Sequence, residues 1–475
     1  MNEQPRTIAG AQQDLRTGRV TATQLIEESI ARADAVDEAV GVYIRRFDEQ
    51  ALAAAAEVDA RIARGGELRP LDGIPIGMKD IVSDGDGPTT AQSLVLDPAW
   101  GEATGDAVVV QRLKDAGAII TGKVTTMEFA VGMPDASKPF PVPRNAWDTD
   151  LWAGGSSSGS GSGVAAGVFL GAIGTDTAGS IRIPAAFNGV TGLKATFGRV
   201  PKSGVVPLAY TLDHVGPLTR SARDAAIMLQ AIAGSHASDP YTLDAPVDDY
   251  EAALERGVAG MRIGVDSFQQ HASAGYDPAQ PALFDAAIRT LERAGATIVD
   301  VVMPRYAELT AIDIIVMISE AYAYHRGDIL SRWEDYGQAT RILLAGGEAV
   351  TGADYVQAQR VRRVAQREAD AVLQSVDAVV SSTGHLAAPR IDGISLGDPM
   401  AALASLHTPY WNPLGVPTMA VPIGLSAGGA PLSMSISAPA WGEATVLAVG
   451  DAYQRATDFH LAEPPLVRSL ERQPA

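Results

Sequence analysis

The sequence predicts an α/β fold in which a β-sheet is covered by helices on both faces. Segments with apolar residues at helical spacing alternate along the chain with short apolar runs that are typical of buried strands. Apolar residues make up 46% of the 475 residues and charged residues 20%, a composition typical of globular proteins rather than of disordered chains. Large α/β enzymes of this length can form one core, so we expect a single domain over residues 1–475.

The elements of the first half follow from these patterns. Residues 7–65 are expected to be helical, because apolar residues recur at helical spacing around Leu25 and an alanine-rich stretch follows at 51–65. Residues 71–80 fit a turn that leads into a short strand. The rest of this half is expected to contain helices at 106–117, after 160 and at 222–234, strands at 118–122 and 169–173, and turns up to 216.

The second half repeats the alternation of strands and helices. We expect strands at 261–265 and 296–302, and helices at 279–294, 308–330 and 353–374. The segment 235–259 is the best candidate for a surface linker, although nothing in the sequence requires two independent domains.

Charge and composition exclude several classes of function. The formal net charge is −19, whereas nucleic-acid and anionic-membrane surfaces attract basic proteins. The absence of cysteine excludes disulfides, thiolate metal sites and a cysteine nucleophile. The N-terminus lacks the apolar stretch of a signal peptide, and the run 163–174 is shorter than the roughly 20 residues that span a bilayer. We therefore expect a soluble, cytoplasmic protein with no nucleic-acid and no membrane partner.

Residues 154–163 consist of glycine and serine and allow several interpretations. A flexible linker is one, but the run leads directly into the apolar segment 164–170. A phosphate-binding loop needs a lysine followed by serine or threonine, and no lysine lies between 139 and 193. A nucleophile elbow, G-x-S-x-G, would place Ser157 at its centre, but it also needs a histidine that the sequence does not identify.

The fourth interpretation rests on several long motifs in a fixed order. Residues 174–185 are Gly-Thr-Asp-Thr-Ala-Gly-Ser-Ile-Arg-Ile-Pro-Ala, and Gly-Ile-Pro-Ile-Gly-Met-Lys-Asp precedes them at 73–80. Further motifs lie at 192–199, 213–220, 412–417 and 443–445. With these motifs the chain resembles the amidase signature family over nearly its whole length. The resemblance implies a mixed, twisted β-sheet core with helices on both faces, and hydrolysis of linear amide-type C–N bonds.

The resemblance also divides the chain by role. It implies N-terminal helices in 1–65, the catalytic core in 66–235 and the second half of the core in 260–475. The segment 303–410 matches the family least, and we expect it to shape the substrate pocket.

A lysine can replace the usual histidine in activating a serine, provided that burial keeps the amine neutral. Lys79 ends an apolar, strand-like run, where a charged ammonium would be costly. The resemblance implies that Lys79 takes a proton from Ser156, which takes one from Ser180, the nucleophile that forms an acyl-enzyme. In the family the middle serine follows a cis peptide bond, which here is Gly155–Ser156.

Other site residues are carried over from the same resemblance. The backbone N–H groups of four consecutive residues would form the oxyanion hole: Thr177, Ala178, Gly179 and Ser180. Supporting roles fall to Ser157, Asp176 and Arg182, the last two as an ion pair. The substrate cleft would include Ala130, Val131 and Gly132. His385 could face the cleft, although a lone histidine in such a place is more often a packed or surface residue.

The main hypothesis is an amidase that cleaves a small acyl amide, with aryl amides and acyl hydrazides among the candidates. The alternative is the glutaminase A subunit of a tRNA-dependent amidotransferase. That role needs a basic and an acidic group to hold glutamine, and Arg362 could be the basic one, although an exposed helix face shared with Arg360 and Arg363 explains it too. An esterase that uses Ser157 and a non-catalytic scaffold are weaker hypotheses.

The sequence also leads to expectations about cofactors and partners. The sequence contains no H-E-x-x-H motif and no nucleotide fingerprint, so we expect neither a metal nor a cofactor. The expected partner is a small-molecule amide substrate, and a homodimer is compatible with the family.

Overall fold

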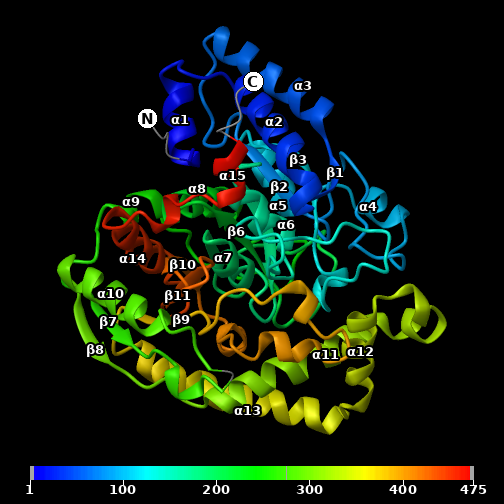
Figure 1. Cartoon of the computed structure of the whole chain (residues 1–475), viewed down its shortest axis with the longest axis vertical. Helices are drawn as coiled ribbons and strands as arrows, with labels where there is room; N and C mark the ends of the chain where they lie inside the picture. Colours follow the sequence, from blue (N-terminus) through cyan, green and yellow to red (C-terminus); the bar gives the residue numbers. More distant parts are fainter. Residues whose placement is uncertain (1–4, 274, 471–475) are drawn as a thin grey trace.

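The computed structural model describes residues 5–273 and 275–470, and in this part the strands form one mixed sheet of 11 strands. The strand order is β1-β3-β2-β4-β6-β5-β10-β11-β9-β7-β8 (Figure 1). The strands are β1 (Tyr43–Arg46), β2 (Pro75–Lys79), β3 (Ile119–Val124), β4 (Gly171–Asp176), β5 (Thr191–Lys194), β6 (His214–Thr219), β7 (Arg262–Val265), β8 (Thr297–Asp300), β9 (Ala378–Ser382), β10 (Thr418–Leu425) and β11 (Pro431–Ser437). The predicted α/β fold with a mixed sheet is confirmed.

The directions of the strands explain why the sheet is mixed. β2 runs parallel to β3 and β4, and β7 runs parallel to β8 and β9. The pairs between these two groups are antiparallel, among them β4 with β6 and β5 with β10. Two parallel groups are thus joined by an antiparallel centre.

Helices cover both faces of the sheet. They are α1 (Ile8–Arg16), α2 (Ala22–Val40), α3 (Asp48–Ala63), α4 (Ala99–Thr104), α5 (Val108–Asp115), α6 (Ser158–Ala165), α7 (Arg182–Asn188), α8 (Ala222–Ile232), α9 (Tyr250–Leu254), α10 (Gln280–Arg293), α11 (Tyr306–Ser331), α12 (Gln338–Gly346), α13 (Gly352–Leu373), α14 (Glu443–Arg455) and α15 (Pro465–Leu470). Short 3-10 helices include η1 (Glu128–Ala130) and η7 (Thr408–Tyr410).

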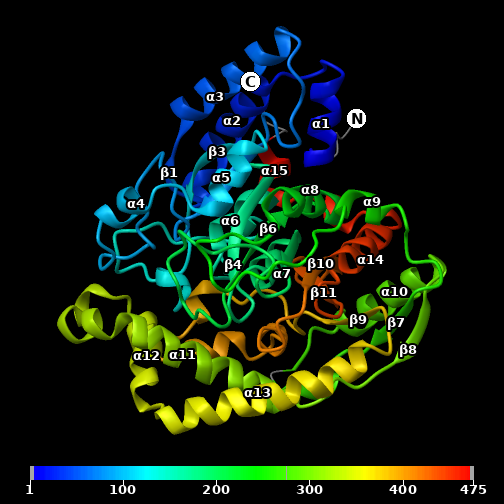
Figure 2. The ribbon, with the colours of Figure 1, turned by 180° about the vertical axis from the view of Figure 1, so that it is seen from behind.

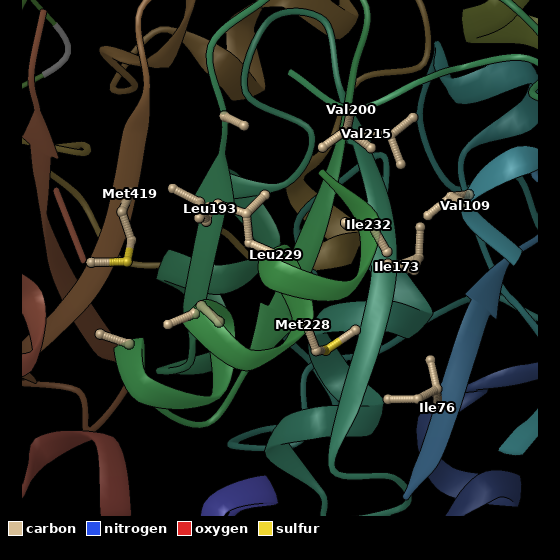
Figure 3. Packing of buried hydrophobic residues seen from close by; sticks show 14 of the residues in the cluster. Ile76, Val109, Ile173, Leu193, Val200, Val215, Met228, Leu229, Ile232 and Met419 are labelled. Atoms are coloured by element: carbon tan, nitrogen blue, oxygen red, sulfur yellow. The ribbon is translucent and has the colours of Figure 1, made fainter. Parts of the chain in front are cut away.

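Alternating side chains of the central strands pack into two different apolar clusters of the core. In β4, Ala172 packs with α6 and α7, whereas Ile173 packs with α8. Figure 3 shows Met228, Leu229 and Ile232 of α8 close to strand residues such as Ile173. Because successive strand residues point to opposite faces, α6 and α7 lie on one face and α8 on the other, together with α10 and α14.

The two ends of the sheet carry different helices. In Figures 1 and 2, α1, α2 and α3 lie at the end with β1 and β3, and the long helices α11 and α13 lie side by side at the opposite end. Among the described residues no helix is long and apolar enough to cross a membrane.

Several predicted boundaries were wrong. The expected helical region 7–65 contains β1 between α2 and α3, and the expected turns before 216 contain β5 and the start of β6. All three strands are only four to six residues long, and β5 and β6 include glycine or proline, so the sequences of these two resemble turns. The candidate linker 235–259 contains α9, whose Tyr250 side chain is buried in the core.

Candidate active site

Lys79 ends β2 with its side chain fully buried beside the start of α6. Its Nζ donates to Ser156 Oγ at 2.7 Å and to Thr175 Oγ1 at 2.8 Å. Thr175 lies in β4, the parallel neighbour of β2, so the sheet itself holds the lysine next to both hydroxyls.

Lys123 and Lys194 are also fully buried, and their partners differ from those of Lys79. Lys123 donates to the carbonyl oxygen of Val82 and to Thr89 Oγ1, and Lys194 donates to the carbonyl oxygen of Val416 at 2.5 Å. A carbonyl oxygen can only accept, so each of these two amines has at least one partner with no proton to give. A hydroxyl can also donate, which leaves Lys79 free to accept a proton from Ser156.

The electrostatic environment favours a neutral Lys79. Burial lowers the pKa of Lys79 to about 7, against the opposing attraction of Asp176 and Asp213. Burial also lowers the pKa of Lys194 to about 7, so the hydrogen-bond partners rather than the pKa distinguish the two lysines.

The segment after Trp152 brings two more serines to this lysine. The expected cis peptide bond between Gly155 and Ser156 is present. The Ser157 N–H donates to the carbonyl oxygen of Ser180 at 3.1 Å, which ties the Ser180 loop to the segment that carries Ser156. Ser180 is half-buried whereas Ser156 is only 3% exposed, so Ser180 is the more accessible of the two.

Ser157 faces the interior rather than the cleft. Its side chain is fully buried, and its Oγ donates to the carbonyl oxygen of Thr175 at 3.2 Å. A nucleophile elbow needs an exposed hydroxyl, so this position argues against Ser157 as the nucleophile of an α/β-hydrolase. It fits a supporting role between α6 and β4.

A buried ion pair shapes the loop between β4 and α7. The Arg182 guanidinium donates to both oxygens of Asp176 at 2.9 Å, and Asn412 Nδ2 donates to Asp176 Oδ1 at 2.8 Å. Burial alone would raise the pKa of Asp176, but the charge and hydrogen bonds of Arg182 hold it well below its usual range. The expected Asp176–Arg182 pair is therefore present, with Asn412 as a third member.

The oxyanion loop differs from the expectation at one position. The Gly179 N–H donates to Asp176 Oδ1 at 2.8 Å, so it does not point toward a substrate carbonyl. Within the described part of the chain, the N–H groups of Thr177, Ala178 and Ser180 have no hydrogen-bond acceptor. These three amides are the donors that the structure leaves for an oxyanion.

The hydroxyl groups of two threonines hold this loop. Thr177 Oγ1 donates to Asp213 Oδ1 at 2.6 Å, and Thr408 Oγ1 donates to the carbonyl oxygen of Ala178 at 2.8 Å. Thr408 lies in η7, which no sequence motif marked, whereas Thr175, the partner of Lys79, lies within the motif 174–185 but was assigned no role.

The expected cleft residues Ala130, Val131 and Gly132 follow a segment that is bound to the serines. The Met127 N–H donates to the carbonyl oxygen of Ser156 at 3.1 Å. Val131 and Gly132 are covered by Thr340 of α12, which donates to the Val131 carbonyl oxygen. Contact of these residues with substrate stays a prediction.

His385 is buried and paired rather than exposed in a cleft. Its Nδ1 is hydrogen-bonded to His407 Nε2, and His407 Nδ1 is hydrogen-bonded to the Tyr306 hydroxyl. Burial lowers the pKa of His385 to about 4, so both the burial and the pairing fit a packed histidine. It is connected to the oxyanion loop through His407 and the adjacent Thr408. Among the described residues, no group of three or more His, Asp or Glu could hold a metal ion.

Comparison with known proteins places the chain among amide hydrolases. A model of the family described as Amidase matches residues 24–447. The A subunit of the glutamyl-tRNA(Gln) amidotransferase of Chloroflexus aggregans is 36% identical, over 98% of this chain and 99% of that protein.

Two solved structures are similar over nearly the whole chain. One comes from a vestigial protein complex linked to the origin of an s-triazine catabolic enzyme, with a TM-score of 0.87, 32% identity, and coverage of 95% of this chain and 98% of the other. The other is the peptide amidase of Stenotrophomonas maltophilia, with a TM-score of 0.81, 28% identity, and coverage of 97% and 98%.

These relatives correct the predicted partners. A small-molecule amide substrate with no nucleic acid was expected, but the amidotransferase relative is one component of an enzyme named for a tRNA. The expectation rested on the net charge of −19. That charge describes the surface of one chain, and in an enzyme of several different chains another chain can supply the basic surface that binds nucleic acid.

Proposed function

This chain belongs to the amidase family, whose members hydrolyse amide-type C–N bonds, and we propose that it cleaves the side-chain amide of glutamine as the glutaminase component of a glutamyl-tRNA(Gln) amidotransferase. The similarity to the corresponding chain of Chloroflexus aggregans covers both chains almost completely. Hydrolysis of this amide gives glutamate and ammonia. A cytoplasmic location agrees with this role, whereas a homodimer and a hydrazide substrate stay predictions.

The observation that carries the chemistry is the buried amine of Lys79, whose two partners are both hydroxyls. In the first step Ser180 Oγ attacks the amide carbonyl, Ser156 takes the Ser180 proton, and Lys79 takes the Ser156 proton. The free amides of the 177–180 loop stabilise the oxyanion. The proton then returns through Ser156 to the leaving nitrogen, which departs as ammonia. Water hydrolyses the acyl-enzyme by the same route.

The position of Arg362 supports an amino-acid substrate. Arg360 and Arg363 are exposed on α13, whereas Arg362 is half-buried and turned toward the active-site loops. Its guanidinium donates to the carbonyl oxygens of Thr211 at 3.0 Å and Pro413 at 2.8 Å. Thr211 lies two residues before Asp213, the partner of Thr177 in the oxyanion loop. A cation at this place would attract the α-carboxylate of glutamine.

Ammonia release tests the proposal. The wild-type protein should release ammonia from glutamine, whereas Ser180→Ala should not, because it removes the nucleophile with little change in volume. Ser157→Ala is the matched control and should keep most of the activity. Release of ammonia from other amides but not from glutamine, with the other amidotransferase components present, would overturn the substrate assignment. Equal activity in Ser180→Ala would overturn the mechanism.

A further inference from the structure

A carboxylate without a hydrogen-bond partner lies in α11. The side chain of Asp313 is fully buried, and neither Oδ1 nor Oδ2 accepts a hydrogen bond from the described residues. By contrast, the buried carboxylates of Asp80 and Asp176 accept hydrogen bonds from Thr90 and Arg182. Leaving a buried carboxylate unpaired is costly, so this exception needs an explanation.

The charged groups around Asp313 place it beside the oxyanion loop. Burial raises its pKa well above the usual range and the charge of Asp176 adds to this, whereas Arg182, Arg362 and Lys194 oppose the shift. α11 also packs against η7, the element whose Thr408 holds the Ala178 carbonyl. Asp313 is therefore a neighbour of the 176–182 loop and of Arg362.

The cations near Asp313 are already engaged elsewhere. Arg182 donates to Asp176, to the carbonyl oxygen of Thr408 and to Asn412. The Arg362 guanidinium donates hydrogen bonds to the carbonyl oxygens of Thr211 and Pro413. The Lys194 amine also donates to backbone carbonyl oxygens. The carboxyl group thus has three cations near it but accepts a hydrogen bond from none of them, as expected of a group whose partner arrives with the substrate.

We propose that Asp313 accepts hydrogen bonds from the α-ammonium group of the substrate, while Arg362 attracts its α-carboxylate. The two side chains lie on α11 and α13, which pack against each other. Glutamine carries both charged groups on one carbon atom, so an acidic and a basic side chain on adjacent helices match it. This inference rests on the proposed function and adds to it the residue that selects an amino-acid amide over a simple amide.

A pair of substrates isolates the ammonium group. Glutamine and 4-carbamoylbutanoate share the amide and the carboxylate and differ in the ammonium. In Asp313→Asn, kcat/KM for glutamine should fall roughly tenfold to a hundredfold, mainly through KM, because one hydrogen bond to a charged group is lost. The value for 4-carbamoylbutanoate should change less than about twofold. Asp328→Asn, on the exposed face of the same helix, is the matched control and should change neither value.

Binding without turnover provides a second readout. In a Ser180→Ala background, glutamine should raise the melting temperature, and the additional substitution Asp313→Asn should remove most of that rise. The melting temperature without ligand should not fall, because asparagine has nearly the same shape and the carboxyl group that it replaces accepts no hydrogen bond.

The outcomes separate the two proposals. The role of Asp313 would be overturned if Asp313→Asn left kcat/KM for glutamine unchanged, or if it lowered kcat/KM equally for both amides. The glutaminase function would stand in either case. A fall in the ligand-free melting temperature with no change in the ratio of the two substrates would also assign Asp313 to structure alone. Absence of glutamine turnover in the wild type would overturn the proposed function together with this inference.

Discussion

Lys79 is one of three fully buried lysines, and the atoms around its amine distinguish it. The sequence singled out Lys79 because it ends an apolar run, and a family motif assigned its role. The sequence could not reveal that Lys123 and Lys194 are equally buried, nor that Thr175 completes the surroundings of Lys79. Those facts depend on which strand ends become neighbours in the sheet, and residue patterns do not encode that.

The pKa of Lys79 leads to a prediction about pH. Only the neutral amine can accept the Ser156 proton, and burial lowers the pKa of Lys79 to about 7. Activity should therefore rise as the pH increases through about 7 and reach a plateau above it. The measurement is kcat/KM for glutamine as a function of pH, in which this limb reports the free enzyme. A profile that stays flat through neutral pH would show that Lys79 is not the base.

At the scale of the elements, the loop between β4 and α7 is held by the Asp176–Arg182 pair rather than by regular hydrogen bonding. Asp176 accepts from Arg182, Asn412 and the Gly179 N–H, so one carboxylate fixes both ends of the oxyanion loop. The ion pair between Asp176 and Arg182 was predicted from the sequence. The sequence could not show that the pair takes the Gly179 N–H away from the oxyanion hole, because that depends on the local backbone geometry.

Removing one partner of this pair should be costly. Arg182→Met leaves a buried, unpaired carboxylate and is expected to destabilise the protein by about 3–5 kcal/mol. The double substitution Asp176→Asn with Arg182→Met removes both charges and should recover a large part of that loss. Thermal unfolding of the two variants beside the wild type measures the difference. Equal destabilisation in the single and the double variant would mean that packing, rather than charge pairing, holds the loop.

The long helices were predictable, whereas the strands at the centre of the sheet were not. α10, α11 and α13 lie within two residues of the expected boundaries, because their apolar spacing is sustained over several turns. Six strands were missed: β1, β5, β6, β9, β10 and β11. β1 lies between helical segments at the edge of the sheet, and β5 and β6 contain glycine or proline and resemble turns. No strand was expected after residue 302, although β9, β10 and β11 pair there.

At the scale of the whole molecule, the sheet connects the two halves of the sequence. β5 of the first half pairs with β10 of the second, and the strand order runs without interruption from β1 to β8. The resemblance to the amidase signature family, drawn from scattered motifs, is confirmed by the family match over 24–447. The predicted partners were wrong because net charge describes one chain and not the assembly in which it works.

This connection leads to a prediction about unfolding. The expected single domain should unfold in one cooperative transition, because separating the halves would break the pairing between β5 and β10 in the core. Far-ultraviolet circular dichroism and tryptophan fluorescence should therefore give the same melting midpoint. Two clearly separated midpoints would indicate two independently stable units and would contradict the single domain.

The proposed hydrolysis depends above all on the relay from Lys79 through Ser156 to Ser180, and covalent labelling tests this relay most directly. A serine-directed sulfonyl fluoride is added to the wild type and to Lys79→Ala, and the labelled peptide is mapped by mass spectrometry. We predict a label on Ser180 in the wild type and a sharp decrease in Lys79→Ala, because the hydroxyl is no longer activated. A label on Ser157, or a label on Ser180 that is undiminished without Lys79, would contradict the relay.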